Sequence, residues 1–144
     1  MKSLLLIILL TLSASPRLGL SANNTASFNL KQVYEKLNLA SFRNSTGPAR
    51  ESGQKYFSHL DLPLSKISED TLLVENEDWS YRVKLLKVRD MNRDGIIDAV
   101  ICFTEKAKHA TYNAQQPMLI TQYHPGGDFV ALRFKVDGCE EYAN

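Results

Sequence analysis

Apolar residues recur with a helical period in the stretch that begins at residue 27. Positions i, i+3, i+4 and i+7 are occupied by Leu30, Val33, Tyr34 and Leu37, which is the spacing of an amphipathic helix. Asn29 precedes them and is a favoured N-cap residue. A second stretch begins at Pro48 and runs to residue 60, with a helix-weakening glycine inside it. The pattern predicts one or two helices within residues 27–60.

From residue 71 the apolar positions follow the period of strands. The expected strands are residues 71–75, 79–88, 98–105, 117–123 and 129–136. Both parities of residues 98–105 are apolar, which predicts a central strand covered on two faces. The alternation slips at Leu85 and Leu86, which indicates a β-bulge. The expected fold is an α+β domain, residues 23–144, in which the N-terminal helix or helices pack on an antiparallel meander of four to five strands within residues 71–136.

The first residues have the composition of a secretory signal peptide. Lys2 supplies a positive start, residues 4–12 are apolar, and small residues surround a possible cleavage point after Ala22. The apolar run of about nine residues is short for a membrane helix, which needs roughly twenty. The expected protein is therefore secreted or periplasmic, and free of the membrane after cleavage.

The net charge of the chain adds little to this interpretation. The chain has 17 basic and 16 acidic residues, and removal of residues 1–22 leaves 15 and 16, a net charge of −1. No basic block interleaved with aromatic residues occurs, which argues against nucleic acid as a partner. Asn23 and Asn44 stand in N-x-T patterns, which matter only in an organism that glycosylates exported proteins.

The two cysteines, Cys102 and Cys139, are most simply interpreted as a disulfide in an exported chain. The bond would tie the tail, residues 137–144, to the sheet. A catalytic thiol is the alternative, although Cys102 lies in an apolar strand with no adjacent base.

The segment "DMNRDGIID" has the side chains of a calcium loop. Hard oxygen donors stand at positions 1, 3, 5 and 9, glycine follows at position 6, and position 7 can offer its backbone carbonyl. The candidate ligands are Asp90, Asn92, Asp94, Ile96 and Asp98. Position 12, where an EF-hand needs glutamate, is Ile101, so the loop does not belong to an EF-hand.

This loop, followed directly by the apolar strand "AVICF", resembles the calcium loops of VCBS and FG-GAP repeats in integrin α-like β-propellers. The resemblance implies one structural Ca²⁺ in a blade-like hairpin. The motif occurs once, whereas a propeller needs at least four blades. Two alternatives remain from the residues themselves. The loop could be a metal-free turn whose side chains accept backbone N–H bonds, or it could carry catalytic carboxylates.

An enzyme is the less favoured interpretation. His59, His109 and His124 are dispersed, and no G-x-S-x-G or H-E-x-x-H motif is present. Residues 105–116 form the longest predicted loop, and its Lys106, Lys108, His109 and Tyr112 are candidates for a partner surface.

The sequence thus predicts an exported calcium-binding domain that acts as a binding or inhibitory module for an unidentified protein or glycan. A secreted or periplasmic hydrolase, or a hydrolase accessory protein, is the first alternative. A purely structural surface component is the second.

Overall fold

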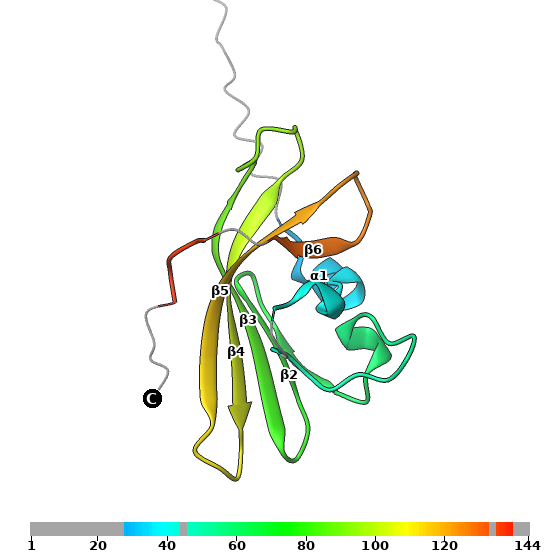
Figure 1. The fold of residues 1–144 in the computed structure, drawn as a ribbon, viewed down its shortest axis with the longest axis vertical. Helices are drawn as coiled ribbons and strands as arrows, with labels where there is room; N and C mark the ends of the chain where they lie inside the picture. The colour runs from blue at the N-terminus through cyan, green and yellow to red at the C-terminus, as the bar shows by residue number, and fades with distance from the viewer. Residues whose placement is uncertain (1–27, 44–45, 133–134, 140–144) are drawn as a thin grey trace, which may run out of the picture.

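The computed structural model describes residues 28–43, 46–132 and 135–139. Six strands follow one another in a single antiparallel meander sheet (Figure 1). Their bounds are β1 Leu64–Ile67, β2 Thr71–Glu75, β3 Trp79–Arg89, β4 Asp98–Ala107, β5 Asn113–Gln122 and β6 Phe129–Leu132. Helical structure within these residues consists of α1 (Leu30–Lys36) and two 3-10 turns, η1 (Leu39–Ser41) and η2 (Phe57–His59).

The fold is β-rich, so the predicted α+β architecture of helices packed on four to five strands is wrong. The second predicted helix does not form. Gly53 has a φ of +89°, and the Leu39 N–H donates to the Lys55 carbonyl at 2.9 Å. The backbone of this segment therefore bonds to a distant part of the chain, which an uninterrupted helix would prevent.

The strand count was also underestimated, because β1 has no apolar alternation that periodicity could detect. All four of its residues are exposed, and Leu64 and Ile67 are among the large apolar side chains in contact with solvent. Its pairing with β2 contains a register irregularity between Leu64 and Lys66. An edge strand held by backbone hydrogen bonds on one side carries little sequence signal.

The predicted long loop, residues 105–116, is mostly strand. β4 continues to Ala107, β5 begins at Asn113, and Glu105 pairs with Ala114 across the hairpin. The hairpin was not predicted because this stretch is mostly polar, and the prediction relied on the spacing of apolar residues. The connection is residues 108–112.

The last predicted strand is shorter than expected, since β6 ends at Leu132 and residues 135 and 136 are outside any strand.

The first predicted helix and the bulge are confirmed. The Asn29 side chain accepts a hydrogen bond from the Lys31 N–H at 2.9 Å, which caps α1. The pairing of β3 with β4 shifts register between Leu85 and Lys87. As a result, Leu85 and Val88 both pack against the core although they are three positions apart, which a regular strand does not allow.

The core lies between one face of the sheet and the segment that contains α1, η1 and η2. Leu30, Val33 and Phe57 pack there against β-strand residues such as Ile101 and Phe103. The loop between β3 and β4 lies at one end of the sheet, and the loop between β4 and β5 lies at the other (Figure 1).

No helix in the described ranges is long and apolar enough to cross a membrane. The predicted signal peptide lies outside those ranges.

Candidate functional site

The predicted calcium loop connects β3 to β4. Arg89 and Asp98 pair at the ends of the two strands, so residues 90–97 form the tip of this hairpin. Gly95 has a φ of +86° and Arg93 a φ of +62°. Glycine adopts such a conformation without the steric cost that other residues meet, which explains the residue type at position 6 of the motif.

Side chains of the loop accept hydrogen bonds from its own backbone. Asp90 Oδ2 accepts from the Gly95 N–H at 2.9 Å, and Asp94 Oδ1 accepts from the Ile96 N–H at 2.8 Å. Asn92 Oδ1 accepts from the Asp94 N–H at 3.1 Å. These are the bonds that the metal-free turn requires. They also hold the side chains on the inner side of the turn, so they are compatible with both interpretations.

Asp98 differs from the other acidic residues of the loop because its side chain is completely buried. It is the first residue of β4 and has a relative exposure of 0%. Its Oδ2 accepts from the Met91 N–H at 2.7 Å and from the Asn92 N–H at 3.2 Å, so the carboxylate faces the loop. Its Oδ1 is buried without a hydrogen-bond partner. A buried carboxylate oxygen without a partner is unfavourable.

The carboxylates of the loop are not gathered into a preformed metal cage. Within the described ranges, no group of three or more His, Cys, Asp or Glu side chains is arranged to hold a metal. The amide oxygen of Asn92 and the carbonyl of Ile96 are further possible ligands of other types. No ion pair described for this part of the chain neutralises Asp90, Asp94 or Asp98.

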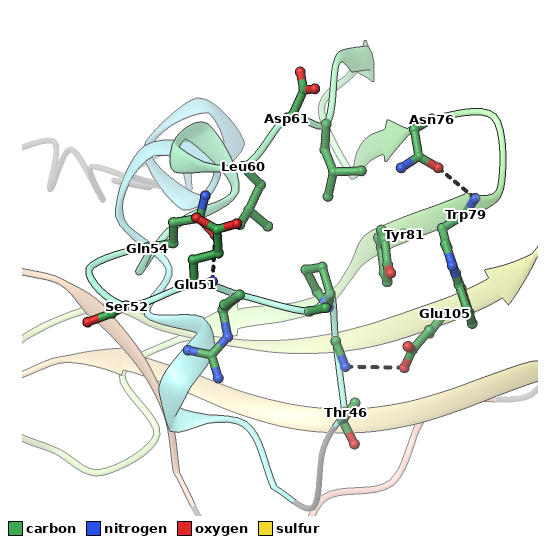
Figure 2. Close-up of a pocket in the computed structure, with 15 residues that line it drawn as sticks. Thr46, Glu51, Ser52, Gln54, Leu60, Asp61, Asn76, Trp79, Tyr81 and Glu105 are labelled. Atoms are coloured by element: carbon green, nitrogen blue, oxygen red, sulfur yellow. Dashed lines mark hydrogen bonds between the residues drawn. The ribbon is translucent and has the colours of Figure 1, made fainter.

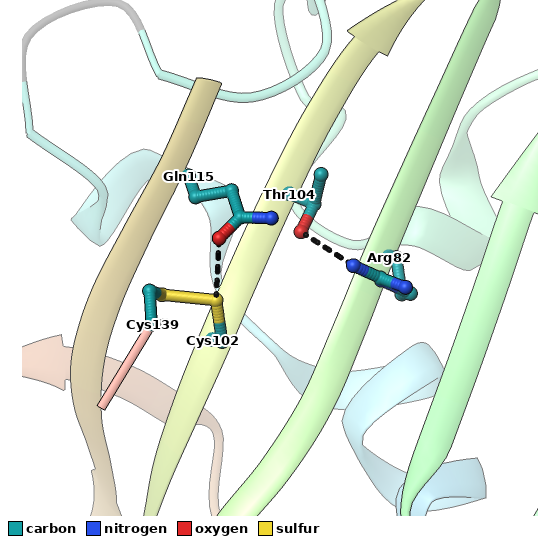
Figure 3. Close-up of a disulfide and its surroundings, with 5 residues drawn as sticks. All are labelled: Arg82, Cys102, Thr104, Gln115 and Cys139. Carbon is teal, nitrogen blue, oxygen red and sulfur yellow. Dashed lines mark hydrogen bonds between the residues drawn. A yellow bond between two sulfur atoms is a disulfide. The ribbon is translucent and has the colours of Figure 1, made fainter. Parts of the chain in front are cut away.

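The predicted disulfide is confirmed. Cys102 and Cys139 are bonded, with their Cα atoms 5.4 Å apart (Figure 3). The bond joins the middle of β4 to the C-terminal segment, which passes Leu86 closely enough that a Cβ on Gly138 would lie 2.7 Å from Leu86 Cδ1. Neither sulfur is therefore a free thiol nucleophile while the bond is intact.

The predicted partner surface contains residues that are engaged within the chain. Lys108 Nζ lies 3.1 Å from Glu75 Oε2, and His109 Nε2 lies 3.0 Å from the Glu77 carbonyl oxygen. Lys106 is part of β4 rather than of a loop. These contacts tie the end of the β4–β5 hairpin to the end of the β2–β3 hairpin.

The histidines of the hydrolase alternative lie in different places. His59 belongs to η2, where its Nδ1 lies 3.3 Å from the Lys55 N–H. His124 is in the turn between β5 and β6, close to Gly127. Neither lines the cavity described next.

That cavity lies between the sheet and residues 46–62 and has a volume of about 960 Å³ (Figure 2). We call it the aromatic cleft. Its wall on the sheet is formed by Trp79 and Tyr81 from β3 and by Glu105 from β4. The two rings are stacked, with centroids 6.1 Å apart and planes at 14°. The opposite wall comes from residues 46–54 and 60–62.

Glu105 is the buried charged group of the aromatic cleft. Its exposure is 7%, and its Oε2 accepts from the Gly47 N–H at 3.1 Å (Figure 2). Burial raises the pKa of its carboxyl, while the hydrogen bonds from Gly47 and from the Tyr112 hydroxyl lower it. Burial, and then the charge of Glu105, raise the pKa of Tyr81 to about 12. At neutral pH the phenol of Tyr81 is therefore protonated.

The aromatic cleft was not predicted from the sequence. Trp79 and Tyr81 have the alternation of any half-buried strand, and Glu105 was placed at the start of a loop. One signal was present: an acidic residue continues the core-facing parity of Ala99, Ile101 and Phe103. Because β4 runs through Glu105 to Ala107, this parity places Glu105 on the covered face.

Comparisons of the chain with protein-family models, with curated proteins and with solved structures find no match. The likeness of residues 90–103 to VCBS and FG-GAP loops therefore stays a prediction.

Proposed function

We propose that this protein is an exported binding domain whose β3–β4 hairpin is stabilised by one structural Ca²⁺. The proposed ligands are the side chains of Asp90, Asn92, Asp94 and Asp98 and the carbonyl of Ile96. The observation that carries the proposal is Asp98 Oδ1, a fully buried carboxylate oxygen without a hydrogen-bond partner. A cation bound inside the loop would supply the missing interaction.

The charge of the loop supports a divalent cation. Three carboxylates lie within nine consecutive residues, and no ion pair described for them offsets their repulsion. Asp90, Asn92 and Asp94 accept hydrogen bonds from the backbone, but these bonds do not use all of their acceptor sites, since a carboxylate has about four. The remaining sites could bind a cation after small side-chain rotations, without unfolding of the turn.

Calcium fits the loop better than magnesium does. Ca²⁺ accepts 6 to 8 oxygen ligands in flexible geometry, whereas Mg²⁺ demands an octahedral arrangement and holds its water strongly. Export would suit a weak site, because extracellular calcium modules have dissociation constants of about 10⁻⁴–10⁻³ M. The disulfide between Cys102 and Cys139 supports an oxidising compartment.

The role is proposed as structural because one of the ligands, Asp98, belongs to the strand itself. Asp98 is the first residue of β4, and the following residues are buried on both faces. A loop fixed in this way stabilises a hairpin. The binding function is assigned to another part of the surface, and its partner is an unidentified protein or glycan.

A thermal melt in calcium, magnesium or EDTA tests the proposal. If free calcium is about ten times the dissociation constant, binding adds roughly 1.4 kcal/mol to the free energy of unfolding, and the midpoint rises by about 5 °C. Asp94→Ala is expected to abolish this rise, whereas Asp137→Ala, which removes an exposed carboxylate in the tail, preserves it.

Asp98→Asn makes the test sharper because it keeps an acceptor for the Met91 and Asn92 N–H groups. We expect this variant to be about as stable as the wild type in EDTA and to lose the response to calcium. A wild-type midpoint that is the same in calcium and in EDTA would refute the calcium site.

A further inference from the structure

We propose that the aromatic cleft binds a small organic ammonium ion, with the carboxylate of Glu105 as its counter-ion. The inference rests on the proposed binding function and names the ligand class that this function would serve. It does not depend on the calcium loop, which lies at the opposite end of β3 and β4.

The first argument is the unneutralised charge of Glu105. The residue is 7% exposed, its Oε2 accepts a hydrogen bond from the neutral Gly47 N–H, and the Tyr112 hydroxyl that interacts with it is also neutral. No ion pair described for this part of the chain includes Glu105. Buried carboxylates are normally paired with a positive charge, so a cationic ligand would complete the environment of this one.

The second argument is the aromatic wall beside this carboxylate. Trp79 and Tyr81 are stacked, and the Tyr112 ring meets Trp79 edge to face with centroids 5.8 Å apart. The faces of such rings attract cations, and tryptophan does so most strongly. Because the pKa of Tyr81 is raised to about 12, mainly by burial, its ring presents no second anion near neutral pH.

The third argument is the charge at the rim of the aromatic cleft. Glu51 and Asp61 line it together with Arg50, so the whole lining, with Glu105 included, has a net charge of −2. This charge would attract cations from solution. The volume of about 960 Å³ is in the range of small-molecule sites. A neutral sugar would use the same ring faces but would leave the charge of Glu105 unbalanced.

Trp79 is the only tryptophan of the chain, so its fluorescence reports directly on the aromatic cleft. The purified protein, in calcium-containing buffer at constant ionic strength, is titrated with butylammonium, tetramethylammonium, 1-butanol or maltose. We expect both cations to change the Trp79 emission with saturation, and the neutral compounds to have no saturable effect. The relative affinity of the two cations distinguishes a hydrogen-bonded primary amine from a quaternary ammonium group.

Two variants that each lose one negative charge show whether the cation binds at Glu105. Glu105→Gln is expected to weaken cation binding about tenfold or more, whereas Glu69→Gln, which removes an exposed carboxylate outside the aromatic cleft, changes it by less than about twofold. Circular dichroism checks that each variant is folded. If Glu105→Gln does not fold, Asp61→Asn replaces it, with an expected weakening of about two- to threefold.

The proposal is overturned if butanol binds as well as butylammonium, which would indicate an apolar cavity. Saturable binding of maltose without binding of the cations would indicate a carbohydrate site instead. Equal effects of Glu105→Gln and Glu69→Gln would indicate unspecific charge attraction. Repeating the titration in EDTA separates the two proposals, since cation binding that survives there upholds the aromatic cleft even if calcium has no effect on melting.

Discussion

The two ends of β4 each bury a carboxylate, but the carboxylates are held in different ways. Asp98, at the beginning of the strand, accepts hydrogen bonds from backbone groups 6 and 7 residues away. Glu105, near its end, accepts from Gly47, 58 residues away. The first arrangement is built by a continuous segment, and the second by segments that only the fold brings together. A local arrangement leaves a motif in the sequence, whereas a non-local one does not.

The largest effect is expected from removal of the disulfide, because Cys102 lies on β4 between the two carboxylates. The double variant Cys102→Ser, Cys139→Ser should lose about 4 kcal/mol of unfolding free energy, since the bond closes a loop of nearly forty residues. Urea unfolding followed by Trp79 fluorescence measures this loss. Calcium and ammonium responses should both persist under native conditions. Loss of one response alone would show that the tail supports a single end of the strand.

A smaller effect is expected from Gly95→Ala in the predicted calcium loop. The φ of +86° at Gly95 disfavours alanine by about 1–2 kcal/mol, while a Cβ there would meet nothing within 4 Å. Gly53→Ala is the matched control, with a φ of +89° and equally open surroundings. Chemical denaturation should show a similar loss for both, and only Gly95→Ala should also weaken the calcium response. Equal calcium responses in the two variants would contradict a metal site at this turn.

The third prediction concerns pH and the other end of the strand. Burial raises the pKa of Glu105 above its ordinary value of 4.5. The folded state therefore binds the proton more tightly than the unfolded state does, and this contribution to stability is present below pH 4.5 and is lost as the pH rises through the folded-state pKa.

Glu105→Gln removes this dependence. Without ligand, we expect the variant to melt roughly 1–3 °C higher than the wild type at pH 7 and at nearly the same temperature at pH 4. Melts between pH 4 and pH 8 measure the difference. A variant that is less stable at pH 7 would mean that the charge of Glu105 is already compensated inside the protein.

The smallest effect is expected from Tyr112→Phe. The interaction of the Tyr112 hydroxyl with Glu105 lowers the pKa of that carboxyl, so its removal should cost about 0.5 kcal/mol at pH 7 and raise the pKa of Glu105 further. Urea unfolding at pH 7 and pH 4 checks this, with the loss expected at pH 7. Tyr123→Phe, at a position that is 75% exposed, should change neither value.

The difference between the two ends of β4 also explains which parts of the fold and of the candidate sites could be predicted from the sequence. The helix capped by Asn29 was predicted from local spacing and is confirmed. The ligand pattern of residues 90–98 was identified from local spacing in the same way, and calcium binding there stays a prediction. The disulfide followed from there being two cysteines. The edge strand β1 and the polar end of the β4–β5 hairpin were missed because backbone pairing forms them without apolar alternation. The aromatic cleft needs the segment at Gly47 to lie over Glu105, a contact that no local pattern encodes.

The bulge between Leu85 and Lys87 has a consequence for insertions and deletions in this hairpin. Because it adds one residue to β3, it restores Val88 to the core-facing side and sets the orientation in which the strand enters the turn at Asp90. A deletion of Leu86 would remove the extra residue and leave a regular strand, in which Lys87 and Val88 keep their partners on β4 and Val88 stays on the core-facing side. The orientation of the aspartate motif thus depends on the register of residues 87–89 with β4, so a deletion or insertion within those three residues would disturb it more than the loss of Leu86.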